Sequence, residues 1–120
     1  MSISEARTAT IAFKERKRFS KYERKVKVDR NGMAIFYLFD YPIAAHTKDG
    51  RFFIKKPSIV DNSFVLRQMF VLILEMAGIR YHYWANTLDG HTWDGAWTEI
   101  FNAGTVTMIN KQNPFKLYEH

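Results

Sequence analysis

The chain has 120 residues, of which 47% are hydrophobic and 16% aromatic, a length and apolar content that suit one globular domain and exclude a disordered chain. It contains no cysteine, which excludes disulfides, thiol catalysis and thiolate metal sites and favours a reducing compartment. The net charge is +6, and residues 14–30 carry this whole excess with nine basic and three acidic residues.

The N-terminal segment is open to two interpretations. Residues 2–19 predict a helix through about Arg18, although RTATIAFKE also has the composition of a strand. We treat residues 1–21 as an N-terminal helical extension of a single domain, 1–120. The segment lacks the basic and apolar regions of a secretory signal, so we expect a cytoplasmic protein.

Residues 14–30, here called the basic segment, are the main functional signal. A localised positive charge indicates a polyanion or an acidic protein surface as the partner. The alternative is a solvated helix end followed by a lysine-rich strand, which discourages aggregation. Phe19 and Tyr22 interleave the charges and could stack on bases or pack inward. The residues expected to contact nucleic-acid phosphates are Lys14, Arg16, Lys17, Arg18, Lys21, Arg24, Lys25 and Lys27.

Two hairpins are expected next. YERKVKVDR and MAIFYLF flank Asn31-Gly32, which predicts a type I′ turn, and the next pair, PIAAHTK and RFFIKK, flanks Asp49-Gly50. Val26 and Val28 should share one strand face, with the lysines at 25 and 27 on the other. MAIFYLF is apolar on both faces, so it predicts a central strand that is covered on both sides.

A long apolar helix is expected over residues 64–77. Asp61 or Ser63 can cap its start and Gly78 its end. Its three polar residues fall within one 100° arc. The sequence therefore predicts a largely enclosed helix that is covered by a sheet and by the N-terminal segment or a second subunit, with a homodimer favoured. A charge at Leu72 or Leu74 should then unfold the protein. The apolar run is too short and too polar to span a bilayer.

Short strands should complete the fold: RYHYWANTL, HTW, AWTEIF and TVTMI, separated by Asp-Gly and Ala-Gly turns. The fold class predicted is α+β, with a mostly antiparallel twisted sheet of about five to six strands around one long buried helix, and with a possible N-terminal helix.

The stretch YHYWANTLDGHTWDGAWTEIF, residues 81–101, contains all three tryptophans. Strand alternation assigns most of its aromatics to the core and its Asp-Gly pairs to turns. The remainder, Arg80, His82 and Trp84, is predicted to form an exposed partner-binding face, with His91 and Trp93 near a turn.

Catalytic and metal motifs are missing from the sequence. The spacing of the histidines matches no metal motif, and no nucleophile elbow or phosphate-binding glycine loop occurs. We therefore expect no enzyme activity, no cofactor and no metal. A hydrolase is the least favoured hypothesis, and its candidate residues would be His82, His91, Asp89 and Asp94.

YPIAAHTKDGRFFI, the helix after it and IRYHYWANTLDGHTWDGAWTEI together resemble a group of small uncharacterised proteins encoded by tailed phages. The resemblance covers roughly residues 37–100 and implies a phage setting but no site residues. Helices of that group are usually polar and basic near their start, whereas this one begins DNSFVLRQ.

The leading hypothesis is a small binding protein, of phage or mobile-element origin, that engages nucleic acid or a nucleic-acid-handling complex through the basic segment. The alternative is a protein–protein interaction module, or an inhibitor of a host defence protein, that uses an apolar or aromatic face.

Overall fold

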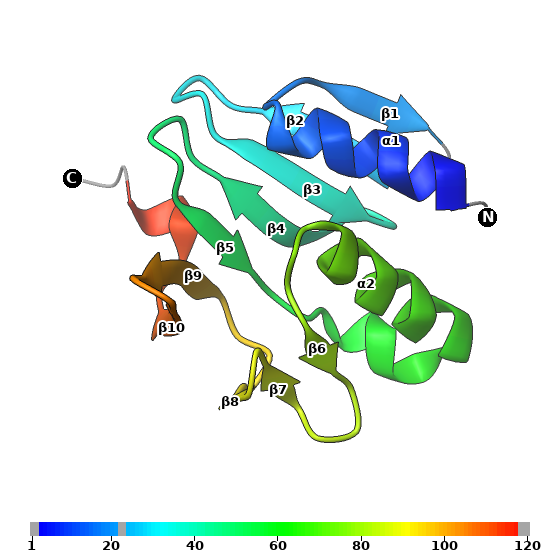
Figure 1. Ribbon diagram of the computed structural model, residues 1–120. Coiled ribbons are helices and arrows are strands. Elements are labelled where there is room, and N and C mark those ends of the chain that lie inside the picture. The colour runs from blue at the N-terminus through cyan, green and yellow to red at the C-terminus, as the bar shows by residue number, and fades with distance from the viewer. Residues whose placement is uncertain (1–2, 22–23, 118–120) are drawn as a thin grey trace.

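Seven antiparallel strands form the main sheet of the computed structural model, which describes residues 3–21 and 24–117. Their order is β1-β2-β3-β4-β5-β9-β10, so the chain leaves the sheet after β5 and returns beside it (Figure 1). The strands are β1 (Phe19–Lys21), β2 (Arg24–Val28), β3 (Ala34–Leu38), β4 (Tyr41–His46), β5 (Phe52–Ile54), β9 (Thr98–Ala103) and β10 (Val106–Lys111).

The segment between β5 and β9 contains one helix and a small second sheet. The 3-10 turn η1 (Ser58–Asn62) leads into α2 (Phe64–Met76), and three two-residue strands follow. These are β6 (Tyr81–His82), β7 (Thr87–Leu88) and β8 (His91–Thr92), which pair antiparallel. The α+β class and the antiparallel pairing are confirmed, with more strands than the sequence predicted.

The helix α1 (Ile3–Lys14) and α2 lie side by side on the same face of the main sheet (Figure 1). The N-terminal segment is therefore helical, but it ends at Lys14, and residues 19–21 form an edge strand instead of further helix. The predicted cap of α2 is confirmed, since the Ser63 Oγ accepts a hydrogen bond from the Leu66 N–H at 3.4 Å. Gly78, with φ 83°, follows the last turn as expected.

The first hydrophobic core lies between the two helices and the sheet. Phe13 of α1 contacts Phe36 and Phe52 with ring centroids 5.8 and 5.7 Å apart, while Phe70 and Leu74 of α2 are fully buried. Helix α1 thus provides part of the apolar cover that α2 requires.

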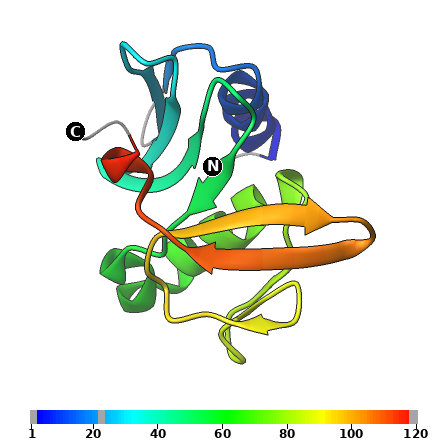
Figure 2. The same cartoon turned by 90° about the vertical axis from the view of Figure 1, so that its left-hand side faces the viewer.

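A second core lies on the opposite face of the sheet, and the sequence did not predict which residues cover this face. Met33, Ile35, Ala45, Phe53 and Trp97 form it, and Leu117 packs against it. The C-terminal 3-10 turn η2 (Pro114–Lys116), red in Figure 2, lies on this side, away from α1. Because β3 contributes to both cores, its predicted burial on two faces is confirmed.

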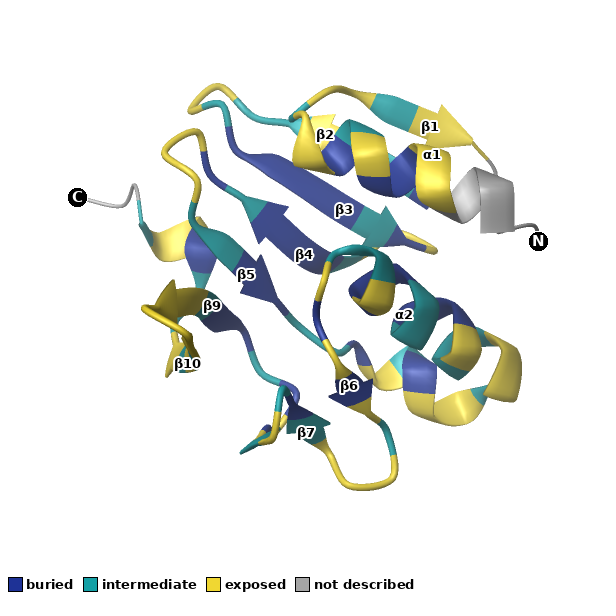
Figure 3. Ribbon diagram, viewed as in Figure 1, coloured by how far each residue is buried: buried dark blue, intermediate teal, exposed yellow. Residues whose placement is uncertain are grey.

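The prediction that α2 is enclosed is wrong. Only Met69, Phe70, Ile73 and Leu74 of α2 are buried, whereas Phe64 is 64% exposed. Figure 3 shows exposed and intermediate segments along α2 as well as buried ones. The physical reason is the placement of α1 beside α2, where it covers the sheet and leaves the outer side of α2 facing solvent.

One predicted turn is of another type, and one turn was not predicted. At Asn31-Gly32 only Gly32 has positive φ, and its N–H donates to the Asp29 carbonyl at 3.0 Å, which is a type I turn followed by a left-handed glycine. The turn with two left-handed residues occurs instead at Phe39 and Asp40, with φ of 49° and 66°, where the sequence contains no glycine.

Candidate functional site

The fold distributes the basic segment over α1, β1 and β2. Seven of the eight cations predicted to contact phosphates lie exposed or half-buried, at the end of α1 and along the first two strands. Arg24 is the exception, at 1% exposure, so the prediction that it contacts phosphate is wrong for this structure. The alternation of β2 turns Arg24 inward together with Val26, while the lysines at 25 and 27 face the other way, as predicted.

Several of the surface cations already have intramolecular partners. Lys14 Nζ donates to the Met76 carbonyl at the end of α2, over 3.1 Å, and so holds the two helices together. Arg16 Nη1 donates to the Thr47 carbonyl at 3.5 Å. Lys17 forms an exposed ion pair with Glu15 at 3.1 Å, which contributes little to stability. These contacts fit the solvated-face alternative for the α1 end of the segment.

Lys25 pairs with the turn residue Asp40, with the Nζ and Oδ1 atoms 2.9 Å apart. The hydrogen bond and the charge of Lys25 lower the pKa of the Asp40 carboxyl. Asp40 occupies one of the two left-handed positions of the β3–β4 turn, so this pair fastens β2 to an otherwise unfavourable turn.

One groove collects cations from β2 and from the residue before β1. Arg18, Lys25 and Lys27 line it, together with Phe19, Ser20, Val26 and Val28. The groove, which we call the β1–β2 groove, has a volume of about 520 Å³.

The aromatic residues near this groove are not free for stacking. Phe19 is half-buried and packs against the first core, so of the two alternatives, base stacking and inward packing, the structure shows the second. The Tyr37 ring lies 4.9 Å beneath the Lys27 Nζ in a cation–π contact. Tyr22, the second interleaved aromatic, lies outside the described residues.

A second, mixed groove lies at the tips of the first two hairpins. Arg16, Arg30 and Lys48 line it together with Glu15 and Asp29, in a volume of about 430 Å³. Lys48 was not predicted, because only the tertiary approach of the two hairpins brings it beside the basic segment. The acidic residues offset part of this charge, so the β1–β2 groove is the more uniformly positive surface.

Most of the aromatic stretch 81–101 belongs to the cores, as predicted. The Trp93 ring stacks on Phe70 with centroids 6.4 Å apart, and its Nε1 donates to the Ala96 carbonyl and the Thr98 Oγ1, both at 3.0 Å. Burial also raises the pKa of Tyr81 to about 12, so its hydroxyl stays protonated. The suggestion that Trp93 belongs to an exposed patch is therefore wrong.

The two aspartates of this stretch serve turns, as predicted. The Asp89 carboxylate accepts a hydrogen bond from the Arg80 N–H at 2.9 Å, and the Asp94 carboxylate accepts one from the Ala96 N–H at 3.0 Å. The His91 Nε2 contacts the Thr107 carbonyl at 2.6 Å. Within residues 3–21 and 24–117, no three His, Asp or Glu side chains gather where they could hold a metal ion.

Arg80, His82 and Trp84 are exposed as predicted, but they do not form one face. Residues 83–86 turn instead of continuing a strand, with Asn86 at φ 51°, and this turn carries Trp84 away. Arg80 and His82 line a polar groove, whereas Trp84 lines a different, apolar one.

The apolar groove lies between the outer side of α2 and the β6–β7 turn, and we call it the α2 groove. Its volume is about 400 Å³, within the range of ligand and partner sites. The Arg67 guanidinium lies 4.7 Å from the Tyr83 ring centroid and 5.7 Å from that of Trp84. The sequence analysis missed this groove because it expected α2 to be enclosed. The lining residues are Phe64, Arg67, Gln68, Val71, Leu72, Glu75, Tyr83 and Trp84.

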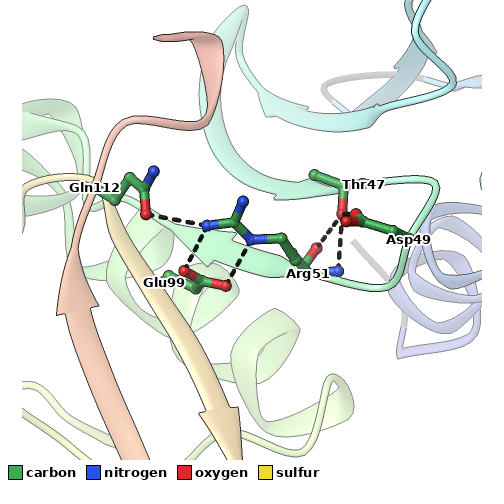
Figure 4. Close-up of polar contacts among 5 residues, drawn as sticks. All are labelled: Thr47, Asp49, Arg51, Glu99 and Gln112. Carbon is green, nitrogen blue, oxygen red and sulfur yellow. Dashed lines mark hydrogen bonds and ion pairs between the residues drawn. The ribbon is translucent and has the colours of Figure 1, made fainter. Parts of the chain in front are cut away.

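A part-buried polar network across the sheet is structural. Arg51 of the β4–β5 turn donates from Nε and Nη2 to the two carboxylate oxygens of Glu99, each at 2.9 Å, and from Nη2 to the Gln112 Oε1 at 3.0 Å (Figure 4). On the other side of Arg51, Thr47 and Asp49 close the turn. The network joins β5, β9 and the segment after β10, and it satisfies the nearly buried Glu99.

Comparison with known proteins identified no relative: no family model, no curated protein and no solved structure matches the chain. The resemblance to phage-encoded proteins therefore stays a prediction. In the part of the chain that the structure describes, neither helix is long and apolar enough to cross a membrane.

Proposed function

We propose that the protein is a non-enzymatic binding protein that contacts the phosphate backbone of nucleic acid through the β1–β2 groove. The observation that carries this proposal is that Arg18, Lys25 and Lys27 line one groove beside β1 and β2. Cations that line a groove neutralise successive phosphates and release their counterions, which drives binding without sequence recognition.

The groove chemistry favours contacts to the backbone over contacts to bases. Phe19 packs inward and Tyr37 lies beneath Lys27, so neither ring offers a stacking platform. We therefore expect affinity to vary little with base sequence and to depend strongly on salt.

The test is fluorescence anisotropy with labelled duplex DNA, single-stranded DNA and RNA over a series of salt concentrations. On duplex DNA, the slope of log K against log salt should approach about −0.9 for each phosphate neutralised. Arg18→Glu and Lys27→Glu, tested separately, should each weaken binding to all sequences alike and reduce the magnitude of the slope by about one.

Arg80→Glu is the matched control, because Arg80 is an exposed arginine that lines a different groove. It makes the same change of charge and should leave affinity nearly unchanged. Absence of binding at low salt, or an equal loss of affinity in Arg80→Glu, would contradict the proposal.

A further inference from the structure

The outer side of α2 is an apolar surface with nothing packed on it in the described part of the chain. Phe64 and Val65 are 64% and 61% exposed, and Val71 and Leu72 are half-buried. Trp84, 86% exposed, flanks the same surface from the β6–β7 turn. Large exposed apolar patches of this kind mark interaction sites.

Two opposite charges lie on this surface at equal distances from its centre. Arg67 and Glu75 both line the α2 groove, and Val71 lies midway, four residues from each. Positions 67, 71 and 75 fall on one side of a helix because they are spaced by about one turn.

Neither charge forms an ion pair within the described residues, although the Arg67 guanidinium contacts the rings of Tyr83 and Trp84. The Arg67 Nε is buried and has no hydrogen-bond acceptor among the described residues. Within the same residues, the Glu75 carboxylate makes no ion pair. An arginine and a glutamate that line one groove without an ion pair favour a partner that brings the opposite charge to each of them.

We propose that the α2 groove is the interface of a homodimer, in which α2 packs antiparallel against α2 of a second copy about a twofold axis near Val71. Under this symmetry Arg67 of each copy lies opposite Glu75 of the other, so both ion pairs form at once. The same operation covers Leu72 and brings Trp84 against the second helix.

The charge pattern favours a second copy over other occupants. A twofold axis matches each surface to itself, so one arginine and one glutamate placed symmetrically about Val71 become fully complementary. Helix α2 has 13 residues and is about 20 Å long, which makes a small interface and predicts a dimer that dissociates on dilution. This inference is independent of nucleic-acid binding.

The test is the molar mass from light scattering and the dimer Kd from sedimentation over a concentration series. The wild-type protein should form a concentration-dependent dimer. Glu75→Arg places arginines opposite each other and should raise the dimer Kd about tenfold or more, because like charges across an interface are strongly unfavourable. The double variant Arg67→Glu/Glu75→Arg restores opposite charges and should recover most of the affinity.

The matched control is Glu15→Arg, an exposed glutamate at the end of α1, whose dimer Kd should equal that of the wild type. Circular dichroism verifies that each variant is folded. A wild-type protein that stays monomeric at every concentration, or that forms larger assemblies, overturns the proposal. So does a double variant that remains as weak as Glu75→Arg.

Discussion

Trp84 and Trp97 show how differently one residue type is used in this chain. Trp97 is 8% exposed in the second core, where its ring meets that of Phe115 at 5.6 Å, while Trp84 is 86% exposed. Trp97→Ala should therefore lower the free energy of unfolding by about 3–5 kcal/mol, the usual cost of truncating a buried large aromatic. Trp84→Ala should change it by less than about 0.5 kcal/mol. Urea unfolding measures both, and equal losses would contradict the assignment.

His46 should make the fold sensitive to mild acid. Its ring packs against the rings of Phe13 and Phe52, and burial, followed by the nearby Arg16 charge, lowers its pKa. The unfolded chain thus binds the proton more readily than the folded chain. The free energy of unfolding should therefore fall as pH decreases below about 6.5, the ordinary histidine value, until it reaches the folded-state pKa.

His46→Gln should remove this part of the pH dependence, whatever its effect on stability at neutral pH. Urea unfolding between about pH 7 and pH 5 isolates the effect. The carboxylates with lowered pKa values become protonated only in more acidic solution; these are Asp40, Asp49 and Asp94. The exposed His82→Gln is the control and should keep the wild-type slope. An unchanged slope in His46→Gln would show that His46 is not responsible.

At the scale of single residues, the sequence predicted which face of a strand a side chain lies on better than it predicted what that side chain does. Alternation in β2 correctly separated Val26 and Val28 from the two lysines. The same alternation places Arg24 with the valines, so its burial could have been predicted, and its inclusion among the phosphate contacts followed only from its charge. The pairing of Arg51 with Glu99 could not be predicted from the sequence, because it joins residues 48 positions apart.

At the scale of elements, α2 separates two leucines that the sequence treated alike. Leu74 is fully buried, whereas Leu72 is half-buried in the α2 groove. Leu74→Asp should unfold the protein, since an unpaired charge in the core cannot be solvated. Leu72→Asp should retain the fold and weaken only the α2 interface. Far-ultraviolet circular dichroism and thermal melting distinguish these outcomes, and unfolding of both variants would mean that the outer side of α2 is covered.

Local elements were predictable and their packing was not. The hairpins, the Ser63 cap and the Gly78 terminator follow from neighbouring residues, so the sequence predicts them. Which side of α2 faces solvent depends on where α1 packs on the sheet, and this is determined by tertiary contacts that the local sequence does not show. The tight β6–β7 turn lacks glycine, and its signal was Asn86, a residue type that tolerates left-handed backbone.

At the scale of the whole molecule, the class of fold and the burial of β3 on both faces were predictable, and the segment that covers the second face was not. Apolar residues on both faces of MAIFYLF indicated that β3 is central. Nothing in the local pattern indicated that residues 114–117 would return to cover the second face, or that β9 would pair with β5. The candidate β1–β2 groove was predictable in part. The sequence identified its cations, but only the order of strands in the sheet shows that they line one groove.

The order of strands in the sheet also determines when each strand can pair with its neighbour during synthesis on the ribosome. Ile54 pairs with Thr98, which is 44 positions later in the chain, so β5 must wait for its neighbour roughly 2–9 s at ordinary rates of translation. Phe53 and Ile35 wait longer still, because Leu117, which packs against their side of the sheet, is made after β10. The nascent chain therefore carries an open β5 edge while 44 residues are added, and an uncovered apolar face for longer, the condition in which chaperones engage a polypeptide.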